Sequence, residues 1–122
     1  MAAISPQQRT EWTALTDRLT AEYQGYDVTI EVLDPQAGAS PLVERLPFDT
    51  LTYDHKDDVV VLAVGGDSPR SPVALRHLIR HPQEFVVDLT PEGAAAKITD
   101  STGTTTLVSL LRRPDGADGP GS

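Results

Sequence analysis

The segment 70–81, RSPVALRHLIRH, is the clearest group of side chains in this chain that could do chemistry. Every charged or titratable side chain in it is an arginine or a histidine, although the whole chain has 18 acidic and 10 basic residues. Guanidinium groups bind phosphate or carboxylate through paired hydrogen bonds, and histidines add charge that depends on pH. The segment therefore predicts a site for an anion or an acidic partner, with Arg70, Arg76, His77, Arg80 and His81 as the candidate ligand-binding residues.

An intramolecular role is the alternative for these arginines. They could pair with acids on neighbouring strands, where an exposed ion pair contributes at most about 1 kcal/mol. The acids in question are Asp27, Glu31, Glu84 and Asp88. If residues 75–80 form a strand, Arg76 and Arg80 share one face, and His77 and His81 lie on the opposite face.

A second cluster lies at 54–58, where three carboxylates and an imidazole fall within five residues: Asp54, His55, Asp57 and Asp58. Oxygen and nitrogen ligands of this kind can hold a divalent cation. The spacing differs from that of a calcium loop, which runs over about twelve residues and closes with a glutamate. A solvated hairpin tip, in which aspartates help to form the turn, is the simpler interpretation. We expect no cofactor.

His77 raises the question of catalysis. It lies between Leu75 and Ile79 in strand alternation and could act as a general base. No serine or aspartate is specifically placed to complete a triad with it, so a half-buried structural histidine is the simpler interpretation. We assign no catalytic residue. A small enzyme using His77 or the cluster at 54–58 is kept as an alternative.

One helix must precede these elements. Apolar residues recur at helical spacing in the N-terminal part: Trp12, Leu15, Leu19 and Tyr23. Ser5, Pro6 and Gln8 fit a capping box at its start, and Gly25 fits its end. We predict a helix over about 6–24.

After Gly25 the pattern changes to short strands ended by turn residues. Strands are predicted at 26–33, 42–46, 51–54, 59–64, 75–80, 84–89, 95–99 and 104–111, with Pro47 ending the second. The predicted fold is α+β: an N-terminal amphipathic helix on a curved, mostly antiparallel sheet of six or seven short strands, with barrel-like closure as one form of it. The domain prediction is an N-terminal extension at 1–5, a single domain at 6–111 and a disordered tail at 112–122.

The composition excludes several classes of protein. The formal net charge of −8 argues against general binding to nucleic acids or to anionic membranes. The chain has no cysteine, which excludes disulfides, thiolate nucleophiles and zinc ribbons. No apolar stretch reaches the roughly 18 residues of a membrane span, and residues 1–10 do not resemble a secretory signal. We therefore expect a cytoplasmic protein.

Several motifs resemble those of a bacterial family of small proteins described as a domain of unknown function. They cover residues 12–111 and include Asp17-Arg18-Leu19, Val28–Leu33, Leu46-Pro47-Phe48, Asp57-Asp58-Val59 and His77–Pro82. The resemblance implies no activity. In architecture alone, the chain is also similar to Sm-like small barrels, which bind RNA with basic loops that this chain mostly lacks.

Taken together, the sequence predicts a non-enzymatic binding or interaction module. Its partner would be a protein or a small anionic ligand that meets the basic segment. A structural homo-oligomer that pairs through sheet edges is a further alternative.

Overall fold

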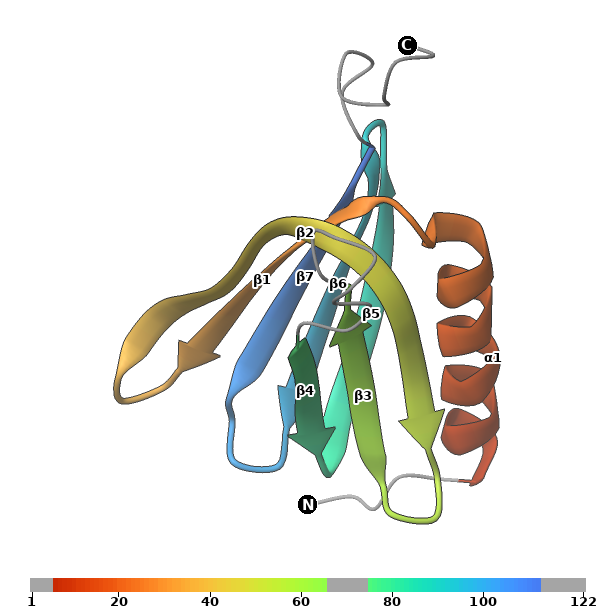
Figure 1. Ribbon diagram of the computed structural model, residues 1–122. Coiled ribbons are helices and arrows are strands. Elements are labelled where there is room, and N and C mark those ends of the chain that lie inside the picture. The colour runs from red at the N-terminus through yellow and green to blue at the C-terminus, as the bar shows by residue number, and fades with distance from the viewer. Residues whose placement is uncertain (1–5, 66–74, 113–122) are drawn as a thin grey trace, which may run out of the picture.

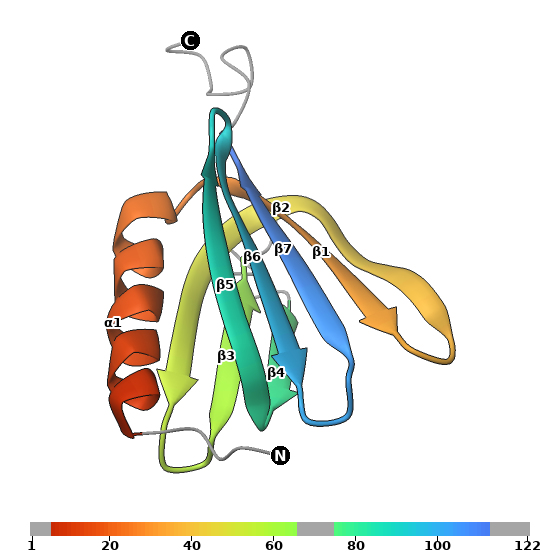
Figure 2. The same cartoon turned by 180° about the vertical axis from the view of Figure 1, so that it is seen from behind.

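The computed structural model describes residues 6–65 and 75–112, with side chains from residue 10 onward. Within these ranges one helix precedes seven strands (Figures 1 and 2). Their bounds are α1 (Pro6–Tyr23), β1 (Asp27–Asp34), β2 (Gly38–Asp54), β3 (Val59–Val64), β4 (Leu75–Arg80), β5 (Pro82–Thr90), β6 (Gly93–Asp100) and β7 (Thr105–Leu111). The α+β prediction is confirmed. The predicted N-terminal extension at 1–5, with Ser5, and residues 113–122 of the predicted tail lie outside the described residues.

The seven strands form one sheet in the order β4-β3-β2-β1-β7-β6-β5, and every neighbouring pair is antiparallel. The sheet is strongly curved, so β1, β7, β6 and β5 make one layer while β3 and β4 lie in another (Figure 1). It is not closed into a barrel, because β4 and β5 form its two edges. These edge strands are nonetheless consecutive in sequence, joined at His81, whose φ is 54°.

One long strand, β2, replaces the two short strands that we predicted around Pro47. Residues 38–47 of β2 pair with β1, and residues 48–54 pair with β3. The register shifts twice between β1 and the first half of β2, and Arg45 there has a φ of 52°. Such bulges bend a strand. Pro47 is tolerated because it lies where β2 leaves β1, at the end of that pairing.

The helix packs mainly against β2. Trp12 and Leu19 are buried, as their helical spacing predicts, and Leu15 and Tyr23 pack partly against the same core. The helix ends before Gly25, whose φ of 93° favours glycine. Among the described residues, no helix has the length and apolar content needed to cross a bilayer.

Candidate binding surface

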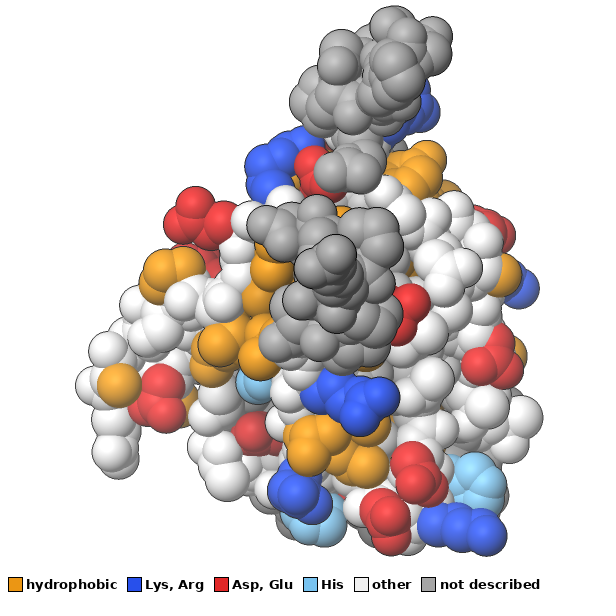
Figure 3. Space-filling model, in the orientation of Figure 1, with side chains coloured by type: hydrophobic (Ala, Val, Ile, Leu, Met, Phe, Trp, Pro, Cys, Tyr) orange, Lys and Arg blue, Asp and Glu red, His pale blue; other side chains and the backbone are white. Residues whose placement is uncertain are grey.

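Strand β4 presents its two arginines on the outward face. Arg76, Leu78 and Arg80 are exposed, whereas Leu75 and His77 are half-buried and Ile79 is buried. This alternation is the period of two that a strand imposes, and it was predicted. We call Arg76, Leu78 and Arg80 the basic stripe. Figure 3 shows blue side chains over β4 with an orange patch between them.

The neighbouring strand does not supply the stripe with a counter-charge. On β3, Ala63 lies opposite Arg76, Val61 opposite Leu78, and Val59 opposite Arg80. The next strand, β2, places Asp54 opposite Val59. Two strand spacings therefore separate Asp54 from the row of Arg80, about 10 Å, which is about one Debye length at 0.1 M salt.

The acids that we considered as partners lie elsewhere. Asp27 is bound by Arg45, with 3.0 Å between Nη2 and Oδ2, and Glu84 lies 3.5 Å from the Lys97 Nζ atom. No ion pair in residues 10–65 and 75–112 involves Arg76 or Arg80. The basic stripe therefore keeps its hydrogen-bond donors available on the described surface. Arg70, the fifth candidate, lies outside the described residues.

His77 points into the molecule. Its Nε2 atom lies 3.3 Å from the hydroxyl of Thr106, a buried residue of β7. Burial lowers the pKa of His77, because desolvation disfavours the charged ring. In the described part of the chain, no hydrogen bond or ion pair joins this ring to a carboxylate. The geometry gives no support to a triad, and catalysis by His77 stays a hypothesis.

His81 does not share the face of His77. It follows the end of β4, and its backbone N–H donates to the carbonyl of Asp58 at 2.8 Å. Its ring Nδ1 atom lies 3.3 Å from the Asp58 carboxylate. His81 thus ties the corner between β4 and β5 to the hairpin that joins β2 and β3.

The cluster at 54–58 forms the tip of that hairpin. The Asp54 carboxylate accepts the backbone N–H groups of Lys56 and Asp57, at 3.0 and 3.4 Å. Asp58 accepts a hydrogen bond from the hydroxyl of Tyr53 at 2.7 Å. Within residues 10–65 and 75–112, no three acidic, histidine or cysteine side chains are placed to hold a metal ion. The Asp54 carboxylate therefore helps to form the turn.

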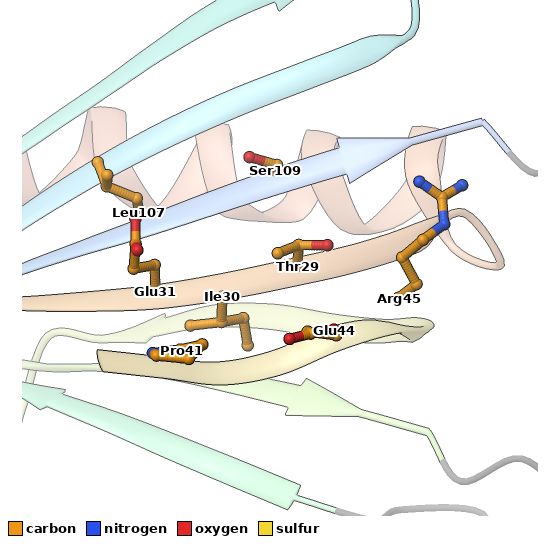
Figure 4. Close-up of a pocket in the computed structure, with 8 residues that line it drawn as sticks. All are labelled: Thr29, Ile30, Glu31, Pro41, Glu44, Arg45, Leu107 and Ser109. Atoms are coloured by element: carbon orange, nitrogen blue, oxygen red, sulfur yellow. The ribbon is translucent and has the colours of Figure 1, made fainter. Parts of the chain in front are cut away.

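Sequence reasoning missed a hollow of about 380 Å³ at the bend of β2 (Figure 4). Its lining residues are Thr29, Ile30, Glu31, Pro41, Glu44, Arg45, Leu107 and Ser109. Two carboxylates enter this hollow, and its arginine is already bound to Asp27. The hollow therefore does not suit an anion, and the basic stripe is the better candidate surface.

The chain was compared with protein families, with curated proteins and with solved structures. The model of a family described as "Family of unknown function (DUF5335)" matches residues 4–120. A curated relative from Aquifex aeolicus (strain VF5), described as an uncharacterized protein, is 32% identical over 78 residues. That match covers 64% of this chain and 64% of the relative, so the chain spans less than two thirds of the relative's length. No solved structure matches, so the likeness to Sm-like barrels is not confirmed.

Proposed function

The chain belongs to the DUF5335 family, whose function is unknown. We propose, from the side chains on its surface, that this protein is a small binding module. The basic stripe on β4 is the contact surface. The partner is an acidic protein segment or a small anion.

One observation carries this proposal. Two exposed arginines flank an exposed leucine, and no described acid pairs with them, although the chain has a net charge of −8. Leu78 is 45% exposed, so the stripe offers apolar area between two cations. Arginine binds carboxylate and phosphate groups in two-pronged geometry, whereas the leucine favours a partner with apolar side chains.

A paired substitution tests the proposal. Arg76→Ala with Arg80→Ala should weaken binding of a glutamate-rich peptide or of inorganic phosphate at least tenfold, measured by calorimetry. The control is Arg18→Ala with Arg112→Ala, which removes the same charge from two exposed arginines elsewhere. Unchanged binding in the first variant would remove the basic stripe from consideration.

The fold should survive this test. Both β4 arginines are exposed, and surface substitutions of this kind usually change the free energy of unfolding by no more than about 0.5 kcal/mol. Circular dichroism and thermal melting would confirm that lost binding is not lost structure.

We propose a cytoplasmic location, since the cysteine-free composition fits a reducing compartment.

A further inference from the structure

The opposite edge of the sheet carries the chemical complement of the basic stripe. On β5, Glu84, Val86 and Asp88 are exposed, while Phe85 is buried and Val87 half-buried. We call Glu84, Val86 and Asp88 the acidic stripe. Val86 is 41% exposed, and it and Leu78 are among the four large apolar side chains described as exposed.

The two stripes have matching spacing. Each places an apolar residue between two charges, two positions away on either side. In antiparallel pairing of β4 with β5, Leu78 lies opposite Val86, Arg76 opposite Asp88, and Arg80 opposite Glu84. Opposite charges and apolar pairs that face each other across antiparallel strands stabilise the sheet.

This pairing does not occur within one copy. The chain turns at His81, and β4 and β5 occupy the two ends of the strand order. Among the described residues, no strand pairs with the outer edge of β4 or with that of β5. A hollow of about 440 Å³ lies between α1 and β5, lined by Trp12, Leu15 and Phe85 among others.

We propose that a second copy of this chain is the acidic partner of the basic stripe. Strand β4 of one copy pairs antiparallel with β5 of the next, so that the sheet continues from copy to copy. This inference rests on the proposed function, because it names the partner of the same surface. Glu84 keeps its contact with Lys97, half-exposed beside it, and Asp88 supplies a carboxylate that no described ion pair occupies.

The charges on the two stripes also determine which edge strands can pair between copies. Pairing β4 with β4 around Leu78 would place Arg76 opposite Arg80, and pairing β5 with β5 around Val86 would place Glu84 opposite Asp88. Like charges directly opposite destabilise a sheet. The contact therefore joins unlike edges, β4 of one copy to β5 of another, and it either closes as a reciprocal pair or a larger ring or continues as a filament.

Charge reversal tests the contact with the full chain. At low salt, the average molar mass of the wild-type protein should increase with protein concentration. Light scattering measures this up to about 1 mM protein, a concentration at which even weak contacts are populated. One variant carries Arg76→Glu with Arg80→Glu, and the other carries Glu84→Arg with Asp88→Arg. Each alone should remain monomeric, and mixing the two should restore assembly, because their altered edges are complementary to each other.

Engineered cysteines test the register, since the chain has none of its own. A Leu78→Cys variant mixed with a Val86→Cys variant should form the mixed disulfide under mild oxidation in preference to either symmetric one. A Leu42→Cys variant is the control, because Leu42 is comparably exposed on β2, away from both edges.

The outcomes separate this inference from the proposed function. A wild-type chain that stays monomeric throughout, with no mixed disulfide, overturns the inference, and the acidic-peptide experiment then decides the proposed function alone. Assembly that persists in both charge-reversed variants also overturns it. Assembly lost in each variant and regained on mixing supports both.

Discussion

At the scale of single residues, His77 shows how burial sets the charge of a side chain. The ring lies on the inward face of β4, against Thr106, and its pKa lies below the ordinary value of 6.5. The unfolded chain exposes the same ring to water. Between the two pKa values the unfolded state therefore binds more protons than the folded state.

The sign of the pH effect follows. As pH falls below about 6.5, this difference should lower the free energy of unfolding, whereas above that pH both states are neutral and His77 contributes no slope. His77→Gln should therefore reduce the loss of stability between pH 7.5 and 5, measured by urea denaturation. His55→Gln, at the exposed hairpin tip, is the control. Equal pH slopes in wild type and His77→Gln would contradict this account.

Single residues also mark what the sequence could not predict. The inward position of His77 follows from the period of two, which is a local property. The ion pair between Arg45 and Asp27 does not follow from a local property, because 18 residues separate the two and the register of β1 against β2 brings them together. The positive φ of Arg45 was equally hidden, since arginine gives no signal for that conformation.

At the scale of elements, the second half of β2 has a backbone edge that no strand of the described chain covers. Residues 48–54 pair with β3 on one side, but β1 pairs only with residues 38–47. A side chain of α1 hydrogen-bonds to part of this uncovered backbone edge. The hydroxyl of Thr20 donates to the Leu51 carbonyl at 2.8 Å and accepts from the Leu51 N–H at 2.9 Å.

Thr20 thus substitutes for a neighbouring strand. Thr20→Val keeps the shape but leaves both backbone groups of Leu51 without this partner, so we expect a loss of about 1–3 kcal/mol in the free energy of unfolding. Thr20→Ser keeps the hydroxyl and should cost less. Chemical denaturation of both variants makes the comparison. If the valine variant were as stable as the wild type, the hydroxyl would have no such role.

The helix and strands differ in how far the sequence revealed them. Pro6–Tyr23 agrees with the predicted helix because apolar spacing and Gly25 are local signals. The continuity of β2 through Pro47 depends on which strands lie beside it, and that is a property of the sheet. Among candidate residues, the exposure of Arg76 and Arg80 followed from alternation, whereas their place on an edge strand required the strand order.

At the scale of the whole molecule, two layers of one open sheet must be held together on the side where α1 lies (Figure 2). Trp12 makes that connection. Its ring contacts Tyr53 of β2 edge-on at 5.5 Å and Phe85 of β5 at 6.1 Å, measured between ring centres. It is also 7% exposed and the only tryptophan in a chain with 5% aromatic residues.

Trp12→Ala should therefore affect both layers at once. Truncation of a buried aromatic residue costs about 3–5 kcal/mol, and few other large side chains are available to fill the space. Trp12→Phe keeps an aromatic ring and should cost less. Hydrogen exchange should show amides of β3 and β5 losing protection together in the alanine variant, because the Trp12 ring contacts both layers. Loss of protection confined to α1 would mean that each layer is stable without Trp12, and that the helix covers the sheet without joining its parts.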